Sequence, residues 1–412
     1  MRALVRTLVR LIWGDDVDPA LRPVLGVSLV TSAASSAMWS FVAIWAIEEL
    51  GAKRELPFAF LVGAILAAAS GFLGGYLSDR IGRRRVILLA QGIMVGYPIL
   101  FLAASDTKWA GLALLALAGM IASVGGSVSQ AMVADLVAPE RHESAYASVR
   151  VASNLGVVAG PPIGGLLLVL GSWSALFPCV AILSGLAWLI AYRFLPRRGA
   201  FAPEGPPERG SLAVILADKP FLLFLGSAIF AWLVYVAYEI VLPVSLVDGF
   251  GYDASAWGFL VWINPLLVTL FQLRLTRRTA GIAPAPKLVA ALLVMGLPFA
   301  LLAWSQSIVA VVIVVVVFVV GEMLWVPTSQ AVVADLAPAD IRGAYMGAFG
   351  SAPAIGFALS PLIGLQVRNS FGDDATWLMF AALGVVAAVL GGLALAGVGR
   401  RLRRDLTAEA AR

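Results

Sequence analysis

Long apolar stretches, separated by short bunches of charged residues, recur along the whole chain. Of its 412 residues, 61% are hydrophobic and only 13% are charged. The apolar runs are about 20 residues long, the length of helix that crosses the hydrocarbon core of a bilayer. A soluble domain of this size needs far more charged surface. The sequence therefore predicts an all-α membrane protein, with the lipid bilayer as a partner.

Twelve such spans are predicted. They lie near residues 23–47, 57–78, 86–105, 109–136, 143–169, 173–195, 220–247, 255–275, 286–304, 308–336, 341–368 and 375–398. If both termini are cytoplasmic, 24 of the 29 Lys and Arg residues lie in or beside cytoplasmic segments. This asymmetry follows the positive-inside rule, so we expect both termini inside the cell.

The same composition disfavours several other classes of protein. The net charge of +5 arises from basic residues in alternate loops that form no single basic face, so nucleic acid is not an expected partner. Cys179 and His142 are the only residues of their types, which predicts neither a disulfide nor a Cys/His metal cluster. No nucleotide-binding loop or Ser/His/Asp arrangement is recognisable. We therefore expect no enzyme, no metal and no cofactor, with a proton gradient as the energy source.

The chain divides into two related halves. A linker rich in Pro, Gly and charge, residues 197–219, separates bundles predicted at 20–196 and 220–398. The segment SQAMVADLVAPERHESAY repeats as SQAVVADLAPADIRGAY, 200 residues later. A repeat of six helices predicts two pseudo-symmetric bundles with a site between them.

The two ends of the chain are basic. Residues 1–13 place Arg2, Arg6 and Arg10 on one helical face opposite leucines, which predicts an amphipathic helix on the cytoplasmic membrane surface. Residues 399–412 are predicted to form a basic cytoplasmic tail.

The loop after the second span reads GGYLSDRIGRRR, residues 74–85. Gly75 and Gly82 permit close backbone approach, and Asp79 lies at a helix end. One interpretation is a positive-inside turn with packing glycines. The full spacing, however, resembles the signature of the major facilitator superfamily, and the spans, repeat and linker are similar to that family along the whole chain. The resemblance implies twelve helices in two six-helix bundles and alternating access by rocking of the halves.

The resemblance also implies a charge lock that holds the cytoplasmic side shut. The resemblance assigns that role to Asp79 and Arg80. Other residues of the loop and of the fifth span complete the gating group: Gly75, Gly82, Arg83, Arg84 and Arg150. The corresponding loop of the second half, residues 272–281, keeps the arginines but has no acid.

The fifth span contains NLGVVAGPPIGG, residues 154–165. Its glycines recur every four residues and form a smooth face for close helix contact, while the prolines are expected to kink the helix. Packing alone is one interpretation. The other is that the segment resembles the Gly-Pro motif of drug/proton antiporters, which implies export. The motif residues are Gly156, Gly160, Pro161, Pro162 and Gly164.

Two acids interrupt apolar spans. Glu322 follows a run of valines, and a carboxylate in mid-membrane costs about 2.5–3.5 kcal/mol on insertion scales. Trp325 and Gln330 share its helical face. Glu239 lies in a second apolar span. On one interpretation, Arg150 or a backbone carbonyl is simply the partner of one of these acids. On the other, both acids line a cavity where they bind protons or a cation.

The stretches around both acids resemble proton-coupled multidrug exporters of the lactococcal type. The resemblance implies cation binding and proton coupling by Glu239 and Glu322, with Asp135 serving protonation and the cytoplasmic charge network. Glu replaces the shorter Asp of that family at 239, so substrate preferences do not transfer. Aromatic faces beside carboxylates suit lipophilic cations. Six further residues are expected to line the cavity: Tyr235, Tyr238, Trp325, Asn154, Asn264 and Gln330.

The leading hypothesis is a proton-coupled exporter of hydrophobic, cationic drugs, acting as a monomer in the bacterial cytoplasmic membrane. Two alternatives stay open. One is proton-coupled transport of an endogenous metabolite or lipid, and the other is a non-transporting receptor or scaffold on the same fold.

Overall fold

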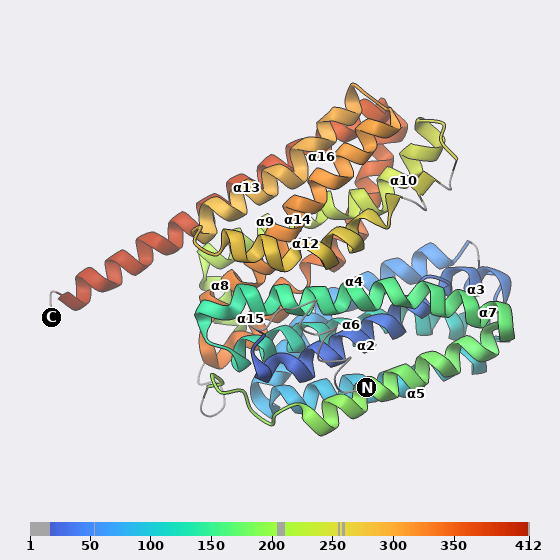
Figure 1. The fold of residues 1–412 in the computed structure, drawn as a ribbon, viewed down its shortest axis with the longest axis horizontal. Coiled ribbons are helices and arrows are strands. Elements are labelled where there is room, and N and C mark those ends of the chain that lie inside the picture. The colour runs from blue at the N-terminus through green and yellow to red at the C-terminus, as the bar shows by residue number, and fades with distance from the viewer. Residues whose placement is uncertain (1–16, 53, 204–210, 254–255, 258–259, 411–412) are drawn as a thin grey trace. The chain divides into compact units, whose positions relative to one another are not determined.

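The described chain is helical and holds no strand. The computed structural model describes all residues except 1–16, 53, 204–210, 254–255, 258–259 and 411–412 (Figure 1). The surface helix predicted at 1–13 therefore lies outside the described residues. Within the described part, ten helices are long and apolar enough to cross a membrane. The all-α membrane fold class is confirmed.

The first half of the chain contributes six long apolar segments. Their helices are α2 (Arg22–Trp39) with α3 (Val42–Glu48), α4 (Leu56–Ile81), α5 (Arg83–Ala103), α6 (Lys108–Leu136) and α7 (His142–Phe194). The fifth and sixth spans were predicted as separate helices but follow each other within α7. Ser172, with φ +58°, interrupts the helical backbone between them. Apolar segments 139–170 and 172–194 meet at that point.

The second half continues the pattern. Its helices are α8 (Ser211–Ala217), α9 (Lys219–Val236), α10 (Leu242–Val244), α12 (Ile263–Thr279), α13 (Pro284–Gly296), α14 (Ile308–Leu336), α15 (Arg342–Phe349) and α16 (Ala352–Ala410). Two π-helical turns, η3 (Ala237–Val241) and η4 (Ser245–Gly249), flank α10. A 3-10 segment, η5 (Leu297–Ala303), extends α13.

Two features reconcile ten apolar helices with twelve predicted spans. The 59-residue α16 contains Gly372 at φ 86° and ψ 175°, so it is two helices joined at a break that glycine tolerates. The eighth span was predicted at 255–275, but α12 begins only at Ile263 and has 17 residues. Arginines at its end, Arg277 and Arg278, make it less apolar than the other segments.

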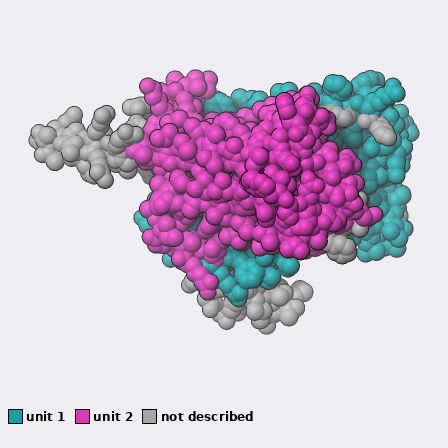
Figure 2. All heavy atoms as spheres, turned by 90° about the horizontal axis from the view of Figure 1, so that it is seen from above, with its two compact units in different colours: residues 1–208, 265–274, 337–351 teal, residues 209–264, 275–336, 352–412 magenta. Residues whose placement is uncertain are grey.

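The chain forms two compact units, coloured separately in Figure 2. Unit 1 comprises residues 1–208, 265–274 and 337–351, and unit 2 comprises 209–264, 275–336 and 352–412. The units are not identical with the bundles predicted at 20–196 and 220–398, because α15 packs against α4 and α6 in unit 1.

An aromatic cluster forms part of the core of unit 1. The ring of Trp45 lies 5.0 Å from Phe101 and 5.7 Å from Phe177, both edge-on. All three side chains are fully buried. Edge-to-face pairs are worth about 0.5–1.5 kcal/mol beyond the area that they bury. This cluster fixes α3, α5 and the second part of α7 to one another.

The helix contacts of unit 2 repeat a pattern of unit 1. In unit 2, Ser360 of α16 donates to the Leu233 carbonyl of α9 at 2.7 Å, and a Cβ on Gly356 would lie 2.7 Å from Trp232. In unit 1, Gly156 and Gly160 occupy the positions 200 residues earlier, on α7 against α2. The internal repeat read from the sequence is thus visible as a repeated mode of helix packing.

Candidate functional site

Four charged side chains meet in unit 1 and form what we call the aspartate–arginine cluster: Asp79, Arg83, Asp135 and Arg342. Asp79 ends α4, Arg83 begins α5, Asp135 lies at the end of α6, and Arg342 begins α15. Gly82 allows the sharp turn from α4 to α5, because its φ of +96° is open to glycine. The space around Gly82 is empty, so backbone conformation and not the expected close approach requires glycine there.

Asp79 caps the first turn of α15. Its two carboxylate oxygens accept hydrogen bonds from the backbone N–H groups of Gly343 and Ala344, each at 2.9 Å. Arg83 forms an ion pair with the same carboxylate. A negative charge at a helix N-terminus also interacts favourably with the helix dipole. The close approach of α15 requires Gly75, where a Cβ would lie 2.6 Å from the carbonyl carbon of Gly343.

Asp135 joins two arginines from different helices. One oxygen accepts from Arg83 Nε at 3.1 Å, and the other accepts from Arg342 Nη1 at 2.8 Å. Asp135 is 1% exposed and Arg83 is 7% exposed. Two buried carboxylates are therefore matched by two guanidinium groups, which offsets the desolvation penalty of each charge. Removal of any one member leaves a net charge within the cluster.

Arg80, to which the charge-lock role was carried together with Asp79, has its guanidinium 4.3 Å from the centroid of the Tyr76 ring. The helix α4 ends before the turn at Gly82, and Arg83, which begins α5 after that turn, is the arginine that pairs with Asp79. Arg84 donates to the carbonyl of Tyr192 at 2.6 Å.

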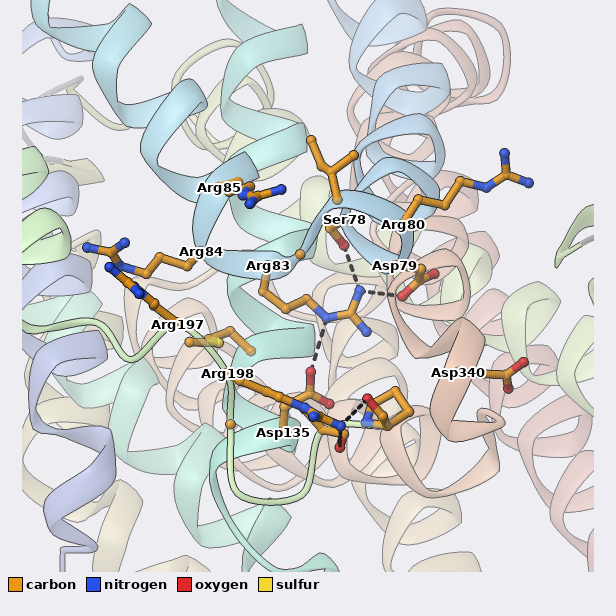
Figure 3. Close-up of a pocket in the computed structure, with 16 residues that line it drawn as sticks. Ser78, Asp79, Arg80, Arg83, Arg84, Arg85, Asp135, Arg197, Arg198 and Asp340 are labelled. Atoms are coloured by element: carbon orange, nitrogen blue, oxygen red, sulfur yellow. Dashed lines mark hydrogen bonds and ion pairs between the residues drawn. The ribbon is translucent and has the colours of Figure 1, made fainter. Parts of the chain in front are cut away.

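A cavity of about 870 Å³ adjoins the cluster in unit 1 (Figure 3). Its charged lining residues are Asp79, Arg80, Arg83, Arg84, Arg85, Asp135, Arg197, Arg198 and Asp340.

The glycine motif of the fifth span packs α7 against α2. A Cβ on Gly160 would lie 2.6 Å from Ala37 N, and one on Gly164 would lie 2.6 Å from Ala37 O. Pro161 cannot donate to the carbonyl four residues earlier, that of Val157. The Ser36 hydroxyl of α2 lies 3.4 Å from this carbonyl and replaces the lost donor. The helix continues through Pro161 and Pro162.

In unit 2, Glu322 is fully buried in α14. Its carboxylate accepts a hydrogen bond from the side-chain amide of Asn264, at the start of α12. Hydrogen bonds to a charged group are among the stronger ones, at about 1.5–3 kcal/mol. Asn264, which was expected only to line a cavity, is thus a direct hydrogen-bond donor to Glu322.

Glu239 is half-buried in the π-helical turn η3. Pro243 follows four residues later, so the Glu239 carbonyl has lost its ordinary α-helical donor. The widened turns on either side of α10 accommodate this proline. π-turns inside helices occur frequently at functional sites.

Aromatic rings connect the surroundings of the two acids. Phe318 lies one turn before Glu322, and its ring stacks on Tyr238 at 4.7 Å, next to Glu239. Tyr235 contacts the same Phe318 ring at 5.8 Å. On the other side of Glu322, Trp325 lies 5.7 Å from Trp232, which in turn contacts Tyr235 at 4.7 Å. These rings form a connected series in unit 2 between sequence neighbours of the two acids, which we call the aromatic path: Trp325, Trp232, Tyr235, Phe318 and Tyr238.

Asn154 and Gln330 were also predicted to line the cavity. Asn154 donates to the backbone carbonyl of Arg150 at 2.9 Å, within its own helix, and Gln330 is half-buried. The sequence prediction missed three residues: Arg342, Phe318 and Trp232. Arg342 lies inside the repeated segment, so that repeat was the available signal for it. Phe318 and Trp232 were recognisable only by their helical spacing from Glu322 and Glu239.

Comparison with known proteins agrees with this architecture. The chain is 27% identical over 385 residues to a Na⁺, Li⁺, K⁺/H⁺ antiporter of Planococcus maritimus, covering 85% of this chain and 89% of the relative. It is 24% identical to the multidrug resistance protein MdtH of Klebsiella pneumoniae, covering 85% and 87%.

Solved structures share the fold. The human organic anion transporter MFSD10 superposes with a TM-score of 0.72 at 21% identity, over 91% of this chain and all of that one. The proton:xylose symporter XylE gives 0.70 at 14% identity, over 90% and 94%. The twelve-helix fold is thereby confirmed. The family model of the Major Facilitator Superfamily matches residues 24–361. Because that match spans most of the chain, and this family consists of transporters and not enzymes, the protein is a membrane transporter of the Major Facilitator Superfamily.

Proposed function

We propose that the protein is a proton-coupled antiporter that exports hydrophobic cations by alternating access. The observation that carries this proposal is the aromatic path, which links the surroundings of Glu239 and Glu322 within unit 2. Carboxylates attract a cation, and aromatic faces bind its charge and its apolar surface together. Acids held within membrane segments are costly and are kept where they serve ions or protons.

The two acids have different surroundings, which supports different roles in exchange. Glu239 is half-buried and directly follows Tyr238 of the aromatic path, so it is the acid that meets the substrate cation. Glu322 is fully buried and held by Asn264, so it takes up the proton. Neutralisation of these carboxylates weakens cation binding and releases the substrate. Each charge moved inward across 100 mV supplies about 2.3 kcal/mol.

The aspartate–arginine cluster serves as the gate of this cycle. It holds α15 against α4 through Asp79 and against α6 through Asp135. A protonated Asp135 no longer attracts Arg83 and Arg342, so protonation there loosens the cluster. The packed glycine face of α7 contributes a rigid helix pair with α2, in keeping with an antiporter motif. The cycle requires one chain, in the bacterial cytoplasmic membrane with both termini inside.

The proposal is tested in proteoliposomes with an imposed pH gradient. Tetraphenylphosphonium, a lipophilic cation, is added, and proton movement is followed with an entrapped pH-sensitive dye. We expect substrate-dependent proton movement in the wild type and none with Glu322→Gln. Asp106→Asn, which removes an exposed loop acid, is the matched control and should behave as wild type. Unchanged exchange by Glu322→Gln would remove this acid from the mechanism.

A second candidate is exchange of protons for Na⁺ or K⁺. The name of the Planococcus maritimus relative favours it. The same liposomes decide between the two, because each cation is added separately to the same preparation. Proton movement with Na⁺ or K⁺ but none with tetraphenylphosphonium would establish the inorganic ions as substrates, and the aromatic path would then serve packing.

A further inference from the structure

The cavity in unit 1 carries an excess of positive charge. Six arginines and three aspartates line it. Two of the aspartates, Asp79 and Asp135, are already engaged by Arg83 and by backbone or Arg342 donors. The remaining arginines face one carboxylate, that of Asp340, which is half-buried. The cavity therefore attracts an anion, and the cluster itself does not use this property.

Several guanidinium donors at the cavity have no acceptor in the described chain. Arg84 uses one Nη atom on the Tyr192 carbonyl, whereas its Nε is buried and lacks an acceptor among the described residues. Arg85 and Arg197 are exposed, and no hydrogen bond or ion pair to another described residue involves either. In Figure 3, the side chains of Arg84 and Arg197 extend toward the same side of the cavity. Like charges gathered in this way are stabilised by a shared anion.

An apolar surface of α5 and α7 leads up to these arginines. The two helices pack together, and Trp188 of α7 donates to the Leu88 carbonyl of α5 at 3.1 Å. Side chains on both sides of this contact are exposed and recur at helical spacing: Leu89 and Ile93 on α5, and Ile182, Leu186 and Leu189 on α7. Such rows suit the acyl chains of a lipid.

Aromatic side chains mark the junction between the apolar rows and the arginines. Tyr192 is 54% exposed and stacks on Trp188 with ring centroids 5.2 Å apart. The guanidinium of Arg84 lies 5.7 Å from the Tyr192 ring. Tyr and Trp are enriched at the depth of lipid headgroups, which places the arginines at the level of a headgroup phosphate.

We propose that this corner of unit 1 binds an anionic phospholipid. The phosphate is held by Arg84 and Arg197, Arg85 adds positive charge at the same cavity, and the acyl chains lie along the exposed rows of α5 and α7. Planar guanidinium groups bind phosphate oxygens in pairs, and basic pockets between membrane helices suit anionic headgroups. The excess positive charge selects lipids with net negative charge over zwitterionic ones. The same chemistry would fit free phosphate, but the apolar rows favour a lipid.

The test is native mass spectrometry of the purified full chain in detergent. The protein is titrated separately with phosphatidylglycerol, with phosphatidylcholine of the same acyl chains, and with inorganic phosphate as a competitor. We expect preferential retention of phosphatidylglycerol that millimolar phosphate does not remove. Each arginine near a charged lipid surface is worth about fivefold in affinity, so Arg84→Gln with Arg85→Gln and Arg197→Gln should weaken binding about 100-fold.

Two matched variants keep the result interpretable. Arg193→Gln removes a charge from the same helix end, where its guanidinium lies over the Phe194 ring outside the cavity lining, and should retain wild-type affinity. Lysine at the three positions keeps the charge but loses paired donors, so it should recover part of the affinity even where the glutamine variant unfolds. Equal retention of both lipids, complete displacement by phosphate, or wild-type binding by the folded glutamine variant would each overturn the proposal.

Discussion

The side-chain amide of Asn264 donates a hydrogen bond to the carboxylate of Glu322, joining the start of α12 to the middle of α14. The two residues are 58 positions apart in the sequence. The bond gives the most deeply buried acid of the chain's proposed transport site a fixed donor. It therefore makes the role of that acid in transport testable through its partner.

Substitution of Asn264 by Leu should slow proton-coupled transport. The buried carboxylate of Glu322 then loses a hydrogen bond worth about 1.5–3 kcal/mol, and with it the donor that fixes its position. The measurement is the initial transport rate in proteoliposomes at one imposed pH gradient. Asn264→Gln, which retains an amide, is the control and should keep more of the rate. A wild-type rate in Asn264→Leu would show that this bond does not support transport.

Substitution of Asp135 by Asn should destabilise unit 1. Arg83, which is buried, and Arg342, which is half-buried, would then share a neutral partner, and loss of one member of a buried ion pair costs about 3–5 kcal/mol. Thermal unfolding in detergent measures the loss as a lower Tm. Asp18→Asn is the matched control, because its 3.5 Å ion pair with Arg141 is at the surface and contributes about 0–1 kcal/mol. Equal Tm shifts in both variants would contradict the assignment.

Substitution of Gly160 by Ala should separate α7 from α2. The new Cβ would clash with the Ser36 hydroxyl and lie 2.6 Å from the Ala37 backbone nitrogen, which cannot move without the helix. We expect a lower Tm, and only partial recovery when Ser36→Ala is added. Gly96→Ala is the control, since it lies in a helix with open space around it and should gain about 0.5–1 kcal/mol. A Gly160→Ala variant as stable as Gly96→Ala would argue against the contact.

The surface pair Glu55–Lys108 predicts that the stability of the protein falls slightly as the pH is lowered. The Lys108 ammonium, 2.6 Å from the carboxylate, lowers the pKa of Glu55 below its usual value of 4.5. The contribution of this ion pair to stability is therefore complete above pH 4.5. It is lost as the pH falls through the lower folded-state pKa of Glu55. Tm measured between pH 6 and 3 should fall less steeply in Lys108→Met than in the wild type. Identical slopes would show that the pair contributes nothing to this dependence.

The long apolar runs predicted the helical fold because crossing a bilayer fixes both the length and the polarity of a helix. The eighth span was placed less well. Its arginines Arg277 and Arg278 extend the helix beyond the predicted end, while its beginning lies later than hydropathy indicated. Hydropathy averages over a window and does not locate a helix start.

The sequence indicated which types of residue belong to the candidate site, but not which partners each of them contacts. Spacing along a helix indicated that Glu322 and Trp325 share a face, yet it contained no information on Asn264 as a ligand of that acid. Likewise, the arginine that pairs with Asp79 is Arg83 and not Arg80, because the turn at Gly82 redirects the chain. Partners far apart in sequence are set by how helices pack, and a single sequence records only which faces are available.

The wide turns around Pro243 have a consequence for how Glu239 is aimed. A π-turn holds one more residue than the α-turn that closes the same gap, and one residue corresponds to about 100° of rotation about the helix axis. The residues that follow η3 are thus turned by about this angle relative to α9, and those that follow η4 by about as much again. Glu239 therefore lies where the helix changes its facing direction, and no hinge loop is needed for that change.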